Sequence, residues 1–273
     1  MKNILYCFSL AALMFITACK EQPIIIPDPN LNVTGRTVLV EEITGVRCTN
    51  CPTGTQTLVA LQQQYGADRL VVVSIHAAGP FSVPYTNQED YRSAEIQELA
   101  DYIGQYFGFP TASIDRRLLV GENSIFITPH SRWGGEVAQD LQEDPSLAIT
   151  LENTFDPSSR ALSIKVGLLP DQQITGEHRL TVLITQDSII SQQLDGSTLV
   201  QNYVHRHMVR DVVTAPSGDN ITEALEAGQL VNKTFNVSLP ATWEAKHCSV
   251  VAYVHRSDVS KEILQAAEKH VIE

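Results

Sequence analysis

The sequence lacks the short motifs that mark several large classes of enzyme. It contains no glycine-rich phosphate-binding loop, no His-Glu-x-x-His zinc helix and no Gly-x-Ser-x-Gly nucleophile elbow. No motif in the sequence therefore indicates a nucleotide-dependent or hydrolytic activity, and we expect no bound cofactor.

Basic residues are scarce. Lysine and arginine number 19 against 31 aspartates and glutamates, which gives a net charge of −12. Without residues 1–18, which hold one lysine and no acid, the charge becomes 18 − 31 = −13. A surface with this excess of negative charge repels nucleic acid and anionic lipid, so we expect neither as a partner.

Cysteine is rare too, with five in 273 residues. Two lie within residues 1–19, Cys48 and Cys51 can pair with each other, and Cys248 is left over. One pair and an odd residue do not make a disulfide framework. Cys248 opens the apolar run Cys248–Val254, where we expect a buried thiol that packs as a small apolar side chain.

Long apolar stretches are missing except at the start of the chain. After Lys2, the run Ile4–Ile16 is almost unbroken but shorter than the ~20 residues that span a bilayer. It leads into Ile16–Cys19, which resembles the lipoprotein box of bacteria. The resemblance implies a signal peptide over residues 1–18 and acyl chains such as palmitate on Cys19, which would anchor the protein in the membrane. The alternative is an ordinary signal peptide followed by an incidental cysteine.

A proline-containing tether is predicted for residues 19–35, because prolines stiffen a linker. The remaining chain is too long for one small core and suits two domains of ordinary size. We place them at residues 36–144 and 145–273, where the sequence pattern changes.

The first predicted domain alternates strands and helices. Thr37–Glu42 is typical of a strand, Pro52 suits the first turn of a helix, and Leu70–Ile75 is typical of a parallel strand covered on both faces. Thr86 and Glu89 have the spacing of a capping box.

The second half of that domain continues the alternation. The helix opened by the capping box is predicted to run to about Tyr106. Thr111–Asp115 and Arg117–Val120 are predicted strands, and a last helix is predicted to start at Thr128-Pro129.

This order of elements around Cys48-x-x-Cys51 resembles the thioredoxin fold over residues 36–144. A cysteine at a helix N-terminus is favoured as a thiolate. The resemblance implies that Cys48 attacks a substrate disulfide and that Cys51 resolves the mixed disulfide.

Two further positions match that fold. Pro110 stands where a cis-proline faces the disulfide, and Phe109 would present its backbone to a bound peptide; the alternative is a trans-proline that ends the preceding helix. Glu42 stands where thioredoxins carry a buried acid, which could take a proton from Cys51. The alternative is a solvent-facing glutamate.

Departures from the thioredoxin pattern are also present. Arg47 replaces the tryptophan before the motif, and Thr49-Asn50 replaces Gly-Pro between the cysteines. Arg47 would stabilise the Cys48 thiolate by its charge, or it is only solvated. His76 ends a strand at the same edge and would also lower the pKa of a thiol if it contacts the pair.

From Pro145 onward, short strand-like segments alternate with turns, which predicts an all-β, immunoglobulin-like sandwich. The tail Ser260–Val271 is either a short helix or a bulged strand. The predicted strands are Leu147–Leu151, Ala161–Leu168, Arg179–Gln186, Leu230–Leu239 and Cys248–His255.

One histidine-rich segment, Tyr203–Arg210, needs a separate interpretation. In a strand, His205 and His207 point the same way and could share a metal ion. No obvious third ligand stands nearby in the sequence, so we expect no metal site. We expect instead a polar strand face that packs on the first domain or on a partner.

Several segments together resemble one family: Val40–Gly45, Cys48–Pro52, Val71–His76, Tyr203–Arg210, Val251–Val254 and Ile263–Ala266. They are similar to the Bacteroidetes outer-membrane lipoproteins related to the 28-kDa outer membrane protein. The resemblance implies a thioredoxin-like domain followed by a β-sandwich. It also implies attachment to the outer membrane, on its periplasmic face or at the cell surface.

Two functions remain open from the sequence. The first is thiol–disulfide exchange on envelope proteins through Cys48 and Cys51. The second is a non-catalytic surface lipoprotein, acting in binding, adhesion or as a complex subunit, in which the same disulfide is structural. In both, the expected partners are the outer membrane, through Cys19, and envelope or surface proteins.

Overall fold

The computed structural model describes residues 35–272. The predicted signal peptide, the lipidation site Cys19 and almost all of the predicted tether lie outside the described residues. Within the described part of the chain, no helix is long and apolar enough to cross a membrane.

Three helices and fourteen strands make up the described fold. The helices are α1 (Cys51–Tyr65), α2 (Ala94–Ile103) and α3 (Trp133–Asp140). The strands are β1 (Val38–Ile43), β2 (Leu70–Ile75), β3 (Thr111–Ile114), β4 (Phe126–Ile127), β5 (Leu147–Phe155), β6 (Ala161–Pro170), β7 (His178–Gln186), β8 (Ile189–Asp195), β9 (Thr198–His205), β10 (Met208–Val212), β11 (Asp219–Asn220), β12 (Val231–Ser238), β13 (Cys248–Arg256) and β14 (Ile263–His270).

One large mixed sheet crosses the predicted domain boundary. Its order is β14-β13-β7-β10-β2-β1-β3-β4, with β11 added beside β7. β1 and β2 are parallel, and β3 lies antiparallel to β1. The junction is the pairing of β10 with β2 at Met208 and Ser74. Both predicted parts therefore contribute strands to a single sheet, while the boundary between residues 144 and 145 stays a prediction.

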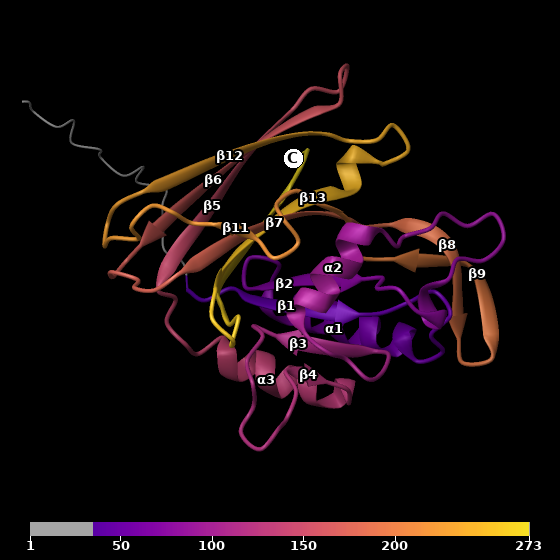
Figure 1. The fold of residues 1–273 in the computed structure, drawn as a ribbon. Helices are drawn as coiled ribbons and strands as arrows, with labels where there is room; N and C mark the ends of the chain where they lie inside the picture. Colours follow the sequence, from indigo (N-terminus) through magenta and orange to yellow (C-terminus); the bar gives the residue numbers. More distant parts are fainter. Residues whose placement is uncertain (1–34, 273) are drawn as a thin grey trace, which may run out of the picture. The chain divides into compact units, whose positions relative to one another are not determined.

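Helices cover both faces of the β1–β2 part of this sheet (Figure 1). Leu58 of α1 and Trp133 of α3 pack on one face, and Ile96 and Leu99 of α2 pack on the other. Both faces of these central strands are thus buried, which explains why Leu70–Ile75 is apolar at nearly every position.

The second half of the large sheet is covered by a separate three-stranded sheet, β12-β6-β5. Leu162 and Ile164 of β6 pack into one apolar core with Val182 of β7 and Val250 of β13. All five strands predicted there are present with small shifts at their ends, and the immunoglobulin-like sandwich as a fold class stays a prediction. The tail forms the strand β14 rather than a helix.

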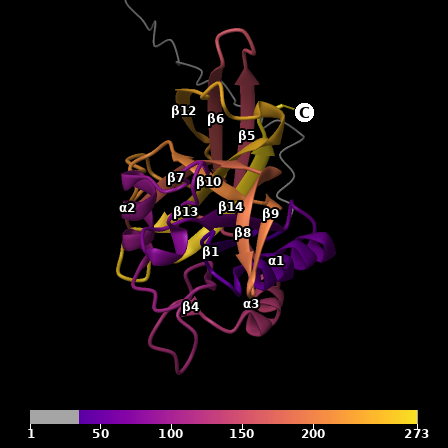
Figure 2. The same ribbon diagram turned by 90° about the vertical axis from the view of Figure 1, so that its right-hand side faces the viewer.

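A small hairpin stands apart from both sheets. β8 and β9 pair only with each other and form a two-stranded sheet. Figure 2 shows this hairpin in front of the large sheet, beside α1. Its position matters for the candidate site described below.

A fully buried ion pair ties β1 to the second half of the sheet. Arg116 donates from Nε and Nη2 to the Glu41 carboxylate at 2.9 and 2.6 Å, and neither side chain is exposed to solvent (0% each). Arg116 also donates to the hydroxyl of Tyr253 on β13 at 3.0 Å. The carboxylate, the guanidinium and the phenol thus form one connected network.

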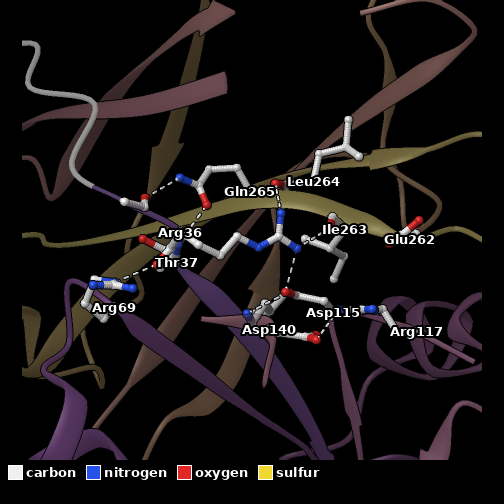
Figure 3. A network of polar contacts seen from close by, with 12 residues as sticks. Arg36, Thr37, Arg69, Asp115, Arg117, Asp140, Glu262, Ile263, Leu264 and Gln265 are labelled. Carbon is white, nitrogen blue, oxygen red and sulfur yellow. Dashed lines mark hydrogen bonds and ion pairs between the residues drawn. The ribbon is translucent and has the colours of Figure 1, made fainter. Parts of the chain in front are cut away.

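A second buried network holds the residues just before β1 in place (Figure 3). Arg36 donates to Asp115 Oδ2 at 2.7 Å and to the carbonyl oxygen of Ile263 at 2.8 Å. Asp115 Oδ1 also accepts from the backbone of Leu39 at 2.9 Å. Burial raises the pKa of Asp115, and the Arg36 charge opposes that rise. The residues just before β1 are therefore held against both β14 and the turn after β3.

The predicted long helix from Thr86 to about Tyr106 is wrong in extent. α2 begins only at Ala94, where Ser93 caps it by accepting a hydrogen bond from the backbone of Ile96 at 3.1 Å. Glu89 does not act in a capping box; it forms an ion pair with Arg210. Gly104, at φ 154°, ends the helix before Tyr106.

The predicted strand Arg117–Val120 is also wrong. Asp115 and Arg116 adopt left-handed backbone angles, φ 46° and 53°, which turn the chain out of the sheet after β3. The strand that pairs with β3 is β4, further along. The last helix, α3, begins at Trp133 rather than at Thr128, because a short 3-10 turn precedes it.

Candidate functional site around the Cys48–Cys51 disulfide

The disulfide lies at the start of α1. Residues 44–50 connect β1 to α1 and form the cysteine loop. Cys48 and Cys51 are joined with an S–S distance of 2.13 Å, which confirms the predicted pairing. Pro52 stands in the first turn of the helix, as predicted. Cys248 lies elsewhere as a buried free thiol whose pKa is raised to about 11 by burial, in agreement with a packing role.

Both cysteines of the disulfide are buried. Cys48 is 2% exposed and Cys51 is 1% exposed, although Thr49 and Asn50 between them are exposed. The N-terminus of a helix usually leaves such a pair open to solvent partners. Here a segment from the second half of the chain lies over it.

The covering segment is β8 and the turn that follows it. The backbone N–H of Leu194 donates to the carbonyl oxygen of Val46 at 2.8 Å. The N–H of Gly196 donates to the carbonyl oxygen of Thr49 at 2.9 Å. β8 thus runs along the cysteine loop like an added strand.

The Gln193 side chain adds a further contact to this loop. Its Nε2 donates to the carbonyl oxygens of Gly45 at 3.2 Å and of Cys48 at 3.1 Å. The Gln193 residue is only 3% exposed. One buried amide therefore satisfies two loop carbonyls beside the disulfide, which are costly to leave unpaired.

A second set of contacts braces the hairpin from the long loop before α2. Gln88 Nε2 donates to the Ser191 hydroxyl at 2.9 Å and to the carbonyl oxygen of Gln192 at 2.8 Å. The Tyr91 hydroxyl also bonds Ser191 Oγ at 2.9 Å. The hairpin is therefore held on the disulfide from two directions.

Glu42 is fully buried beside α1, which settles the choice between a buried and a solvent-facing acid. Its carboxylate accepts from Ser74 Oγ at 2.9 Å and from Thr55 Oγ1 at 3.3 Å. Burial raises its pKa from 4.5 to about 7, against the lowering effect of these hydrogen bonds. Gly54 permits this arrangement, because a methyl group there would lie 2.9 Å from Pro110 and 3.2 Å from Glu42.

The pKa of Glu42 predicts a pH effect on stability. Because the folded-state pKa lies above the usual 4.5, the folded protein binds this proton more tightly, and that stabilisation is lost as the pH rises through about 7. Between about pH 4 and pH 8 the wild type should lose roughly 3 kcal/mol more unfolding free energy than Glu42→Gln. Urea unfolding at each pH measures the difference.

The matched control is Glu152→Gln, since the Glu152 side chain is 68% exposed. This variant should keep the wild-type pH profile. A Glu42→Gln profile parallel to that of the wild type would show that Glu42 titrates normally in the folded protein.

Pro110 lies against Gly54 of α1, and whether it faces a substrate at the disulfide stays a prediction. The Phe109–Pro110 peptide bond is cis, so the alternative of a trans-proline is wrong. The Phe109 ring packs on Phe81 and Tyr106, with centroids 5.2 and 5.8 Å away. Its role in holding a substrate backbone stays a prediction.

Arg47 is neither freely solvated nor engaged with a sulfur in any contact of the described residues. Its guanidinium donates to the carbonyl oxygens of Val83 at 2.7 Å and of Pro84 at 2.9 Å, and it stacks 4.1 Å from the ring centre of Tyr85. Arg47 thus holds the long loop after β2 against the cysteine loop.

His76 lines the same small cavity as Cys51, so the structure brings these two residues together. The cavity has a volume of about 10 Å³, room for about one water molecule, and Gln193 and His205 also line it. Burial, followed by the charges of His205 and Arg210, lowers the pKa of His76 to about 3. A neutral imidazole cannot stabilise a thiolate by charge.

His205 and His207 do not point the same way, so the predicted strand that holds both is wrong. His205 ends β9 and lies 6.1 Å from His76 between ring centres. His207 has a left-handed φ of 53° and turns toward Asp187, with 3.8 Å between Nδ1 and Oδ1. Among residues 35–272, no group of three His, Cys, Asp or Glu side chains is placed to hold a metal ion.

The residue that sequence reasoning missed is Gln193, together with its hairpin. Asp195-Gly196 is a hairpin signal that stands between two stretches of strand-forming residues. That signal was sufficient to predict β8 and β9, but nothing local to it indicates that they cover the disulfide.

Comparison with known families identifies one match. Residues 97–273 match the family described as outer membrane protein Omp28. The match begins within α2, so Cys48 and Cys51 lie outside the matched residues. No curated protein matches the chain.

Solved structures give similar folds at low identity. HBP35 of Porphyromonas gingivalis has a TM-score of 0.71 and 17% identity, covering 87% of this chain and 76% of that one. A protein from Agrobacterium tumefaciens has a TM-score of 0.53 and 12% identity, covering 88% and 96%. A domain of the outer membrane lipoprotein Omp28 from Porphyromonas gingivalis has a TM-score of only 0.33 and 11% identity, covering 47% and 89%. At these identities the first two likenesses concern the fold alone.

Proposed function

Because the chain belongs to the Omp28 family of outer membrane proteins, we propose that it is a non-catalytic outer membrane protein in which Cys48–Cys51 is a structural disulfide. A lipid anchor on Cys19 and the binding of envelope or surface proteins are parts of this proposal. The observation that carries it is the burial of both cysteines, 2% and 1% exposed, beneath β8.

Burial of the sulfurs opposes exchange with a partner protein. Thiol–disulfide exchange requires a thiolate of one protein to reach a sulfur of the other. Here Gln193, Leu194 and Gly196 occupy the carbonyl groups of the cysteine loop. A partner would have to displace these contacts before it reached either sulfur.

The electrostatics around the pair also favour a structural role. A reactive thiolate is stabilised by a nearby cation or a charged imidazole. Arg47 is committed to the Val83 and Pro84 carbonyls, and His76 has a pKa of about 3 and stays neutral. The described contacts of Arg47 thus include neither sulfur of the pair, and the neutral His76 supplies no charge to them.

As a structural element, the disulfide ties the cysteine loop to the first turn of α1. The same loop provides the four carbonyl oxygens, of Gly45, Val46, Cys48 and Thr49, on which β8 docks. We infer that the cross-link keeps these acceptors in place, so that the hairpin keeps its position on the protein surface.

Thiol–disulfide exchange is the second candidate, and one arrangement favours it. Residues 36–144 order β1, α1, β2, α2, β3, β4 and α3 as a thioredoxin-like unit would, with a cis-proline before β3. Glu42, with a pKa of about 7, lies between Ser74 and the first turn of α1 and suits proton transfer near neutral pH. Exchange by this site would first require the hairpin to leave the disulfide.

A trapping experiment separates the two functions. In the Cys51→Ser variant, an exchange enzyme would remain joined to its substrate through Cys48, because the resolving thiol is missing. We expect no Cys48-linked partner on non-reducing gels of cells that express this variant.

The control for trapping is the double variant Cys48→Ser/Cys51→Ser, which leaves no sulfur in the loop. Adducts that appear in Cys51→Ser and disappear in the double variant would establish exchange and overturn the structural assignment. Equal patterns in the two variants support it.

A further inference from the structure

Two buried histidines beside the disulfide carry ring nitrogens that make no hydrogen bond. Both nitrogens of His76 and Nε2 of His205 are buried, and none of the three has a partner among residues 35–272. The two residues are 3% and 4% exposed. Buried polar atoms without a partner are rare in proteins, so these three nitrogens require an explanation, such as a bound water or ion.

The hairpin sets the tautomer of His205. The His205 ring bonds the backbone of Gln192 on β8, and because this bond raises the pKa of His205, the ring donates and the carbonyl oxygen accepts. Nε2 has no partner, so the donor is Nδ1 and the lone pair is on Nε2. Histidines that bind metal ions usually donate their other ring N–H to a carbonyl or carboxylate oxygen in this way.

Both imidazoles are in the form that binds metal. Burial is the main cause that lowers the pKa of His76 to about 3 and the pKa of His205 to about 4. Both rings are therefore neutral near pH 7, and a neutral imidazole offers a lone pair to a metal ion.

The spacing of the two rings fits one ion held between them. Their centres lie 6.1 Å apart. With a metal–nitrogen distance of about 2.0 Å, two imidazoles on opposite sides of one ion have ring centres about 6 Å apart, whereas a tetrahedral ion brings them to about 5 Å. His76 and His205 also line the same cavity, whose volume of about 10 Å³ suits a single ion.

The charges near the cavity favour an ion of low charge. No carboxylate is among the described residues that line it, whereas Arg206 does line it. The charge of Arg210 also acts on His76, more strongly than the opposite charge of Asp90. Positive charges penalise a divalent ion twice as much as a monovalent one at the same distance.

The number of available ligands favours the same kind of ion. Within the described part of the chain, no third His, Cys, Asp or Glu completes a set with these two histidines. Cys51 lines the cavity, but its sulfur is bonded to Cys48. Zinc takes at least three protein ligands. Cu(I), a soft monovalent ion that imidazoles bind well, is satisfied by two ligands in a line.

We propose that His76 and His205 bind one Cu(I) ion between them in a linear, two-coordinate site. The ion would join the residue after β2 to the last residue of β9 and so hold the hairpin against the large sheet. This site goes beyond the proposed function and does not depend on it, because neither sulfur of the disulfide is a ligand.

Copper binding to the full chain in detergent tests the site. Cu(I), kept monovalent by ascorbate in the absence of oxygen, is titrated against a chromophoric chelator. The wild type should bind one Cu(I). His76→Phe and His205→Phe should each lower the affinity by roughly 100-fold or more, since even the loss of an outer-shell partner costs about 10- to 100-fold. Zn(II) should bind far more weakly than Cu(I).

Two variants serve as controls. His270→Phe removes an exposed histidine on β14, and Cys248→Ala removes the free thiol, which is a competing soft ligand. Both variants should bind Cu(I) as tightly as the wild type does. A loss of binding in Cys248→Ala would place the ion at the thiol and overturn the proposal.

X-ray absorption at the copper edge gives a readout that needs no variant, so the test stays decisive if a histidine variant fails to fold. The wild type should show two nitrogen neighbours and no sulfur. A sulfur neighbour, unchanged affinity in both histidine variants, or Zn(II) bound as tightly as Cu(I) would each overturn the proposal. The absence of any Cu(I) binding would also overturn it and would leave water as the partner of the three nitrogens.

Discussion

Replacing Arg116 with methionine is expected to lower the free energy of unfolding by roughly 3–5 kcal/mol, because the change leaves a buried carboxylate without its charge partner. The Glu41 and Arg116 side chains are both 0% exposed and are joined by two hydrogen bonds of 2.6 and 2.9 Å. Tyr253 would lose its donor from Arg116 at the same time. Denaturant-induced unfolding monitored by tryptophan fluorescence measures the loss.

Two comparisons make that result specific. Arg132→Met removes an ion pair with Glu122 that is 43% exposed on both sides, and it should cost less than about 1 kcal/mol. The double variant Glu41→Met/Arg116→Met should recover most of the stability, since no unpaired charge remains. If Arg116→Met costs no more than Arg132→Met, the buried pair does not hold β1 to β13.

The second large effect concerns access to the disulfide. Gln193→Ala should increase the rate at which dithiothreitol reduces Cys48–Cys51 by roughly 10- to 100-fold. The substitution removes the Gln193 donor from the carbonyl oxygens of Gly45 and Cys48, although Gly45 keeps its hydrogen bond from the N–H of Cys48. The loss costs the closed state roughly 1–3 kcal/mol and raises the population of the open hairpin. Quenched alkylation followed by mass spectrometry gives the rate under native conditions.

The neighbouring residue provides the matched control. Gln192 points away from the cysteine loop, and among residues 35–272 its side-chain amide bonds only Gln201 Oε1, at 3.3 Å. Gln192→Ala should therefore leave the rate of reduction close to that of the wild type. Equal rates for both variants and the wild type would mean that the hairpin does not limit access to the sulfurs.

Local apolar patterns were enough to predict most of the strands. Leu70–Ile75 is a continuous apolar run, and it became β2, which is buried on both faces. The alternation in Ala161–Leu168 became β6, whose inward side chains fill the core under β7 and β13. Such segments are predictable because their own residues determine which faces are buried.

Pairings between distant segments could not be predicted in the same way. The two predicted parts share one sheet because Met208 pairs with Ser74, and because the Ser74 N–H donates to the carbonyl oxygen of His207 at 2.7 Å. This junction is made by backbone groups, so no pattern of side chains in β2 or β10 predicts it. The Arg117–Val120 error has a similar origin, since only the backbone turn at Asp115 and Arg116 ends the strand early.

The position of the hairpin over the disulfide could not be predicted, for a chemical reason. Its covered face carries Gln193, which contacts carbonyl oxygens rather than an apolar core. From the sequence alone, a buried polar residue of this kind is predicted to face solvent, because its hydrogen-bond acceptors are not known.

The part of the candidate site that lies in the Cys-x-x-Cys motif could be predicted from the sequence. The contacts that this part makes with segments distant in the sequence could not. The pairing of Cys48 with Cys51 followed from the motif, and the cis form of Pro110 followed from the resemblance to the thioredoxin fold. The contacts of Arg47 with loop carbonyls and of His76 with His205 depend on segments that only the fold brings near.

The reduction potential of Cys48–Cys51 in the full chain tests the central claim most directly. Equilibration in thiol buffers, followed by alkylation and mass spectrometry of the peptide that holds both cysteines, gives the value. Because the folded protein encloses the disulfide and holds its loop, a potential below about −300 mV is predicted, as for structural disulfides of exported proteins. A value well above about −300 mV would mean a labile disulfide and would contradict the structural assignment in favour of exchange.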